Sequence, residues 1–339
     1  MYLGEQLVNP SDARIALAAQ LGVEHFVVEM GVALDGPIAG RWDGARIAAL
    51  QARTARHGIS VDVIGLDVPP LLLALVQGDE ERQHVLFETA IHNIRTAAAA
   101  GVPCLKYSAH MFGVLRSGRT VGRGGAQYQR FDIDEATEDA IAQYTGHGTS
   151  QPRLSAIGPV SAAQSWDALT AFLARVIPVA EECGIHLAFH PQDPPLPPDA
   201  GLHGVHHVLS SVAGLKQFLA LTSSTYHVMN FCQGTVAEMC ANPATEVLDA
   251  IRYFGEIGKI YMVHFRNIRG HNLHFEEVYP DNGDVDMYRA IQVYQEVGYR
   301  GMICPDHVPV SAEDPDRERQ FAFCLGYIKA LLQVTGAVT

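Results

Sequence analysis

The sequence predicts an α/β protein that folds as a single (β/α)8 TIM barrel. Three observations predict this class: a helix–glycine–strand junction that recurs along the chain, eight short apolar runs, and helical periodicity between those runs. At 339 residues the chain is long for one domain, yet barrels of this class commonly reach that length. We therefore expect one domain over residues 1–339.

The recurring junction is a helical run, then a glycine, then a short β-rich apolar run. The glycine stands where a helix is expected to end, because a left-handed backbone costs glycine no clash with a Cβ atom. The six glycines are Gly22, Gly58, Gly101, Gly184, Gly258 and Gly298. Repetition of this unit along one chain favours alternating helices and strands.

Eight strands are expected once the opening run and the run TYHVMNFCQG are added. They lie near residues 2–7, 25–30, 60–67, 103–109, 185–190, 226–232, 260–266 and 301–306. The runs are nearly continuous in apolar residues, which is typical of a parallel sheet covered on its outer face. The segments between them carry apolar residues at three- and four-residue spacing, which predicts amphipathic helices. No GxGxxG motif follows the first run, so an open doubly wound sheet has little support.

One connection is much longer than the others. The segment at about 110–160, after the fourth expected strand, is rich in glycine and arginine and includes GVLRSGRTVGRGGAQYQRFD. A long loop at the C-terminal face of a barrel is usually a lid or a binding loop, and a merely mobile insertion is the alternative. We expect an inserted active-site loop within the single domain.

Composition excludes several classes of partner. The chain has 24 basic and 37 acidic residues, a net charge of −13, and no basic run, so nucleic acid is not an expected partner. No apolar stretch is long enough to span a membrane, and the first residues carry no secretion signal, so we expect a cytoplasmic protein. Six cysteines at wide, irregular spacing fit reduced thiols. Barrels of this size commonly pair, so a homo-oligomer is also expected.

Four consecutive strands end in groups that bind metals. These residues are His190, Cys232, His264 and Asp306. Each one alone is more often a core or rim residue, but all four fall at the same end of neighbouring strands, where the active site of such a barrel forms. Imidazole, thiolate and carboxylate together suit Zn, Mn, Fe or Co and are too soft to favour Mg or Ca. The sequence therefore predicts one divalent metal ion at the barrel mouth.

At these residues the chain resembles the mannonate dehydratase family of xylose-isomerase-like, metal-dependent barrels. The matching motifs are FHPQDPP, close to the family's HPDDPP, and then NFCQG, VHFRNIR, GDVDMY and PDH, in the family's order and at comparable spacing. The resemblance spans most of the chain. It implies a hydro-lyase that converts D-mannonate into 2-keto-3-deoxy-D-gluconate, with Mn as the usual ion at the four ligands and Fe, Co or Zn as alternatives.

The resemblance also implies roles for other residues. His307 and Arg266 match the PDH and RN elements, so they are the first candidates for acid/base chemistry and substrate binding. Further catalytic candidates at the end of the fourth strand are His110 and Tyr107. The candidate substrate-binding residues are Arg116, Arg119, Asp193 and Asn267. Arginines in the long loop could grip the carboxylate of a sugar acid.

Two segments differ from the family's pattern, and both are expected to face the substrate. After PDH the chain lacks the family's longer GYGLYDRA-like segment with its tyrosine, and YSAHMFGVLRSGRT replaces the family's pattern after the fourth strand. Two other functions therefore stay open: a metal-dependent isomerase, epimerase or eliminase acting on another sugar, and an inactive sugar-binding barrel. The four ligands argue against the inactive barrel, because burying them without an ion leaves unpaired polar atoms.

Overall fold

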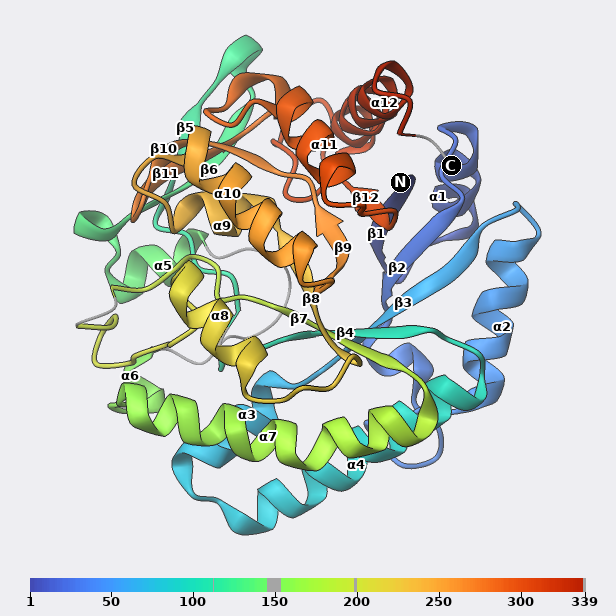
Figure 1. Cartoon of the computed structure of the whole chain (residues 1–339), viewed down its shortest axis with the longest axis vertical. Coiled ribbons are helices and arrows are strands. Elements are labelled where there is room, and N and C mark those ends of the chain that lie inside the picture. The colour runs from blue at the N-terminus through green and yellow to red at the C-terminus, as the bar shows by residue number, and fades with distance from the viewer. Residues whose placement is uncertain (112, 145–153, 198–199, 338–339) are drawn as a thin grey trace.

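The centre of the molecule is a closed barrel of eight parallel strands, seen in a computed structural model that describes residues 1–111, 113–144, 154–197 and 200–337 (Figure 1). Around the barrel the strands follow the order β1-β12-β9-β8-β7-β4-β3-β2. They are β1 (Tyr2–Val8), β2 (His25–Glu29), β3 (Ser60–Leu66), β4 (Cys104–Ser108), β7 (His186–His190), β8 (His227–Cys232), β9 (Ile260–His264) and β12 (Met302–Cys304). Each expected strand coincides with one of these, so the predicted barrel is confirmed.

Helices surround the barrel (Figure 1). They are α1 (Asp12–Gln20), α2 (Gly44–Ala55), α3 (Pro69–Gln77), α4 (Glu80–Ala99), α5 (Glu138–Tyr144), α6 (Leu154–Ile157), α7 (Ala162–Cys183), α8 (Val212–Ala220), α9 (Gln233–Glu238), α10 (Pro243–Glu256), α11 (Met287–Glu296) and α12 (Glu318–Val334). Short 3-10 helices are η1 (Gly31–Leu34), η2 (Arg123–Gly125), η3 (Ile133–Glu135) and η4 (Pro280–Asn282). The six junction glycines all have positive φ, between 65° and 83°, as expected.

The long helix α7 illustrates how sequence signals fix the ends of an element. It begins with a capping box, in which Ser161 Oγ accepts a hydrogen bond from the backbone N of Gln164 and the Gln164 side chain accepts one from the backbone N of Ser161. It ends at Gly184, a left-handed residue whose N–H donates back to the helix. The next residues enter β7, so the cap sets where that strand starts.

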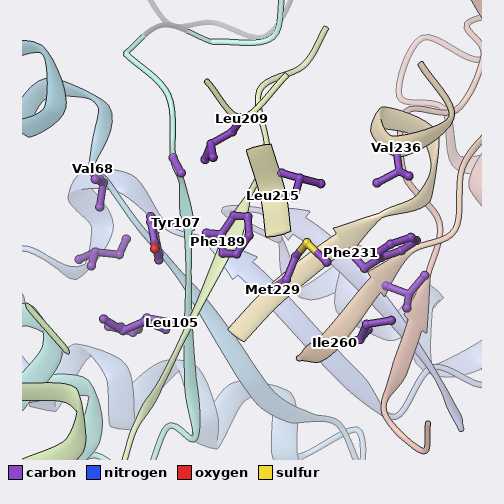
Figure 2. Packing of buried hydrophobic residues seen from close by; sticks show 14 of the residues in the cluster. Val68, Leu105, Tyr107, Phe189, Leu209, Leu215, Met229, Phe231, Val236 and Ile260 are labelled. Carbon is purple, nitrogen blue, oxygen red and sulfur yellow. The ribbon is translucent and has the colours of Figure 1, made fainter. Parts of the chain in front are cut away.

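Two separate cores follow from the alternation of side chains along each strand. The inner core fills the barrel and consists of Val27, Val63, Cys104, Ala188, Val228, Met262, Met302 and Cys304. The outer core lies between strands and helices and includes Leu105, Phe189, Met229 and Phe231 (Figure 2). On each strand, the residue two positions after an inner-core residue also faces the barrel interior, and it lies nearer the C-terminal mouth of the barrel.

A second sheet of four antiparallel strands, called here the accessory sheet, is built from two distant segments. Its order is β10 (Asn267–His271), β11 (His274–Val278), β6 (Gln127–Asp132) and β5 (Gly118–Val121). The segment expected to be a loop thus contains two strands, although residue 112 and residues 145–153 of that segment lie outside the described residues. β5 and β6 pair with each other as a local hairpin, but their residues are mostly polar, so they lack the apolar runs from which the barrel strands were predicted.

Two further observations bear on the expected cellular setting. Within the described ranges, no helix combines the length and the hydrophobicity that crossing a bilayer requires. All six cysteines are free thiols, as expected from their spacing.

Candidate metal centre and active site

The four candidate ligands converge at the mouth of the barrel. His190, Cys232 and His264 are the last residues of β7, β8 and β9, and their ligand atoms lie within 4.8 Å of one another. Asp306 follows β12, with Oδ1 3.5 Å from Nδ1 of His264 and Oδ2 3.5 Å from Sγ of Cys232. Residues far apart in the sequence therefore present four donor atoms to one small volume, where they could hold one transition-metal ion.

Each histidine has one ring nitrogen engaged and one directed toward the other ligands. His190 Nδ1 lies 2.7 Å from the carbonyl oxygen of Pro191, so it donates there and leaves Nε2 as the acceptor nitrogen. His264 Nε2 lies 3.0 Å from Gln6 Oε1 and donates to it. Its Nδ1 is buried with no hydrogen-bond partner among the described residues. An outer hydrogen bond that fixes the tautomer of a ligating histidine is the usual arrangement at metal sites.

The protonation states of these residues also fit a cation. Burial lowers the pKa of His190 to about 4 and lowers that of His264 well below its ordinary value, so both imidazoles are neutral at pH 7. Burial raises the pKa of the Cys232 thiol to about 12, so the thiol must lose a proton when it binds a metal. Burial also acts to raise the pKa of Asp306, but the nearby cationic groups, His307 first, outweigh it and keep the carboxylate charged.

A buried ion network lies behind the ligands. It consists of Arg116, Asp193, Glu238, Arg266, Glu277 and His307. Arg266 is its hub, with Nη2 2.7 Å from Asp193 Oδ2 and Nε 3.3 Å from Asp306 Oδ2. Arg116 Nη1 lies 2.6 Å from Asp193 Oδ1, and both arginines pair with Glu277 of the accessory sheet. The network therefore connects the accessory sheet to a candidate metal ligand.

Four of the residues expected to act on substrate lie within this network: Arg116, Asp193, Arg266 and His307. The side chains of Arg116, Asp193 and Arg266 are almost completely buried, and their charges are matched by one another and by Glu277. Arg266 also contacts Sγ of Cys232, at 3.5 Å from Nη2. These contacts support a role in holding the ligands in place, one step removed from the substrate.

His307 is the network residue whose side chain is partly exposed, and it lies next to the ligand Asp306. Its Nδ1 lies 2.6 Å from Glu277 Oε1 and its Nε2 lies 3.7 Å from Asp306 Oδ1. Burial acts to lower the pKa of His307, but the carboxylates of Asp306 and Glu277 outweigh burial and raise it. The side chain is 17 % exposed, which leaves it within reach of a molecule bound at the mouth.

Four other predicted residues have different surroundings. Tyr107 belongs to the outer core, where its ring centre lies 5.2 Å from that of Phe172 (Figure 2). Asn267 Nδ2 donates to the carbonyl oxygens of Pro280 and Val285, at 2.9 Å each, and so fixes the chain that follows β11. The remaining two are His110, buried just beyond β4, and Arg119, exposed on β5.

Two groups of residues near the ligands were absent from the sequence analysis. Glu238 and Glu277 complete the ion network, and nothing in their local sequence separates them from surface acids. Gln6, Glu29 and Lys106 line the other side of the mouth. A lysine within the apolar run CLKYS was a usable signal, because a charge on a strand buried on both faces needs a partner.

Comparison with known proteins decides the family. A profile described as D-mannonate dehydratase (UxuA) matches residues 12–338. The chain belongs to the D-mannonate dehydratase family. The expected resemblance and the hydro-lyase class are thereby confirmed.

Individual relatives agree with this assignment. Mannonate dehydratase 2 of Halalkalibacterium halodurans is 29 % identical over 299 residues, covering 80 % of this chain and 81 % of the relative. Mannonate dehydratase of Thermotoga maritima is 28 % identical over 311 residues, covering 84 % and 82 %. Among solved structures, mannonate dehydratase from Streptococcus suis serotype 2 has a TM-score of 0.79 at 22 % identity, covering 100 % of this chain and 95 % of that one.

The fold is shared more widely. D-psicose 3-epimerase from Clostridium cellulolyticum H10, solved with D-tagatose, has a TM-score of 0.59 at 13 % identity and covers 100 % of this chain and 99 % of that one. That identity supports a common xylose-isomerase-like barrel and carries no argument about substrate. The family assignment favours dehydration over the sugar epimerisation that the sequence left open.

Proposed function

We propose that this chain is a metal-dependent hydro-lyase that converts D-mannonate into 2-keto-3-deoxy-D-gluconate. The observation that carries the proposal is the convergence of the four candidate ligands at the barrel mouth in a member of this family. We propose Mn as the ion, with Fe, Co and Zn as the alternatives that the donor set also suits.

The reaction removes water from two neighbouring carbons. A proton leaves the carbon beside the carboxylate, the hydroxyl leaves the next carbon, and the resulting enol becomes the keto acid. The proton and the hydroxyl together account for the water released. A divalent ion held by the four ligands supplies charge stabilisation for the carboxylate and hydroxyl oxygens.

Side chains of the protein then divide the remaining work. We assign the proton transfer to Nε2 of His307, because Glu277 holds the other ring nitrogen and orients the imidazole beside Asp306. Arg266 keeps Asp306 and Cys232 in position through its contacts with both. The ion network thus acts as a support for the ligands and for His307.

The test is an assay of the purified, Mn-loaded protein with a panel of aldonates that includes D-mannonate. Formation of 2-keto-3-deoxy acids supports the proposal, and no product with any aldonate refutes it. Replacement of His307 by Gln should remove most of the activity, while the same change at the exposed His84 of α4 should not. A protein that purifies without a transition metal, and gains no activity from added Mn, would favour the inactive sugar-binding barrel.

Three expectations about the whole molecule remain predictions. They are a single domain, a cytoplasmic location and a homo-oligomeric state. Light scattering coupled to size-exclusion chromatography measures the last of these directly.

A further inference from the structure

The half of the barrel mouth opposite the metal ligands contains a buried charged cluster. Strands β1 to β4 are neighbours in the barrel and form this half, while β7, β8, β9 and β12 carry or precede the ligands. Lys106 Nζ on β4 lies 2.7 Å from Glu29 Oε1, at the end of β2, and 2.8 Å from Gln6 Oε1 on β1. The lysine side chain is 9 % exposed and that of Glu29 is 32 % exposed, so the ammonium is buried while the carboxylate is partly accessible.

The backbone makes room for this pair. A Cβ atom at Gly65 on β3 would lie 1.6 Å from Oε2 of Glu29. The carboxylate of Glu29 therefore lies directly against the β3 backbone, in a space that only glycine leaves open.

One side chain joins this cluster to the metal ligands. Gln6 Oε1 accepts hydrogen bonds from both Lys106 Nζ, at 2.8 Å, and His264 Nε2, at 3.0 Å. The two halves of the mouth are therefore held in a fixed relation by one amide oxygen. A molecule bound to the ligands that crosses the mouth would meet Lys106 and Glu29.

The chemistry of the cluster fits a hydroxyl group better than a second anion. An ammonium group has three donors, and the structure gives Lys106 two acceptors, Gln6 and Glu29. The carboxylate of Glu29 beside the ammonium disfavours a further negative charge. A sugar hydroxyl can accept from Nζ and donate to a carboxylate at the same time.

We propose that Lys106 and Glu29 form a subsite that binds a hydroxyl of the sugar-acid chain beyond the two carbons that react. This proposal rests on the proposed function, and it deepens it by naming the residues that select among aldonates. A buried site built to hydrogen-bond a hydroxyl rejects analogues in which that hydroxyl is absent or misplaced, because its own polar groups are then left unpaired.

The test compares D-mannonate with its C4 epimer, D-talonate, and its C5 epimer, L-gulonate, in the Mn-loaded enzyme. Wild-type protein should prefer D-mannonate in kcat/KM, and Lys106→Met and Glu29→Gln should reduce that preference about 10- to 100-fold, mainly by raising KM for D-mannonate. Lys259→Met is the matched control. This lysine directly precedes β9 and donates to the carbonyl oxygens of Ser224 and His227 at the start of β8, at the end of the barrel away from the mouth.

Two measurements keep the proposal separate from the function itself. Metal content and thermal unfolding show whether each variant is folded and loaded, and Glu29→Gln, which keeps the shape of the side chain, remains informative if Lys106→Met does not fold. Unchanged preference in loaded Glu29→Gln overturns the subsite while leaving the dehydratase intact.

If wild-type protein dehydrates no aldonate, the proposed function fails. Binding of D-mannonate to the Mn-loaded protein, measured by calorimetry, then tests the subsite alone, and equal affinity in wild type and variants overturns it.

Discussion

The two halves of the barrel mouth carry different chemistry. The half on β7, β8, β9 and β12 presents imidazole, thiol and carboxylate groups that suit one divalent ion. The half on β1 to β4 presents an ammonium, a carboxylate and an amide that suit hydroxyl groups. The ligand half can serve any reaction that needs a cation beside a sugar, whereas the other half is where one sugar can be distinguished from another. Substitutions in the two halves should therefore change different quantities.

The largest expected effect is on the ligand half. His264→Ala should remove the bound metal and lower kcat/KM by about 10³-fold, because a metal ion contributes several kcal/mol of charge stabilisation and each 1.4 kcal/mol corresponds to a factor of ten. Elemental analysis and steady-state kinetics measure the two effects. His84→Ala, at an exposed histidine on α4, is the control and should change neither. A His264→Ala protein that keeps both metal and activity would remove the distinction between the halves.

Gln6 tests whether the two halves are coupled. Gln6→Leu removes the acceptor of His264 Nε2–H, and loss of such an outer partner typically weakens metal binding 10- to 100-fold. Competition with a chelator measures this affinity. Gln6→Glu keeps an oxygen for both His264 and Lys106 and should lie much closer to wild type. Wild-type affinity in Gln6→Leu would mean that the halves act independently.

The pH dependence of metal binding should come from the thiol alone. Cys232, with a pKa of about 12, releases a proton on binding, whereas His190, with a pKa of about 4, is already neutral. Raising the pH removes the competing proton, so affinity should increase about tenfold per pH unit between about pH 6 and pH 9. Cys232→Ser should bind metal more weakly, with a flatter pH dependence, and leave the fold intact.

A second buried thiol provides the control for this experiment. Cys240 also has its pKa raised to about 12 by burial, yet it donates to the carbonyl oxygen of Val236 and takes no part in the ligand set. Cys240→Ser should keep the wild-type slope. Unchanged affinity and slope in Cys232→Ser would make Cys232 an ordinary core residue.

The smallest expected effect is on the substrate half. Gly65→Ala forces the flexible end of Glu29 to move while the backbone stays in place, so kcat/KM for D-mannonate should fall about 10-fold at unchanged metal content. Gly326→Ala in α12 is the matched control, since nothing lies within 4 Å of its added methyl group. A fall in metal content in Gly65→Ala would show that this half also holds the ion.

The barrel and the convergence of the candidate ligands could be predicted because their signals are local. Strand alternation and strand ends are visible in the sequence, and together they place His190, Cys232 and His264 on one rim. The same alternation could have excluded Tyr107, because its neighbour Lys106 faces the interior and Tyr107 must then face the helices.

The remaining features depend on contacts between distant segments. Arg116 and Arg266 were expected to reach the substrate, yet both are occupied by Asp193 and Glu277, one of which lies on a strand that was not foreseen. Glu29 ends its strand like any solvated rim residue, and only closure of the barrel brings it to Lys106. Charge pairing across a fold is decided by tertiary geometry, which the sequence does not display.

The accessory sheet has a consequence for anyone who recombines related barrels. The segment after β4 supplies Arg116 and β5, and the segment after β9 supplies Glu277 on β11. The two charges meet beside Arg266. If only one of these two segments is exchanged for that of a homologue, a buried charge is left without its partner, at a cost of about 3–5 kcal/mol. Chimeras should therefore exchange both segments together.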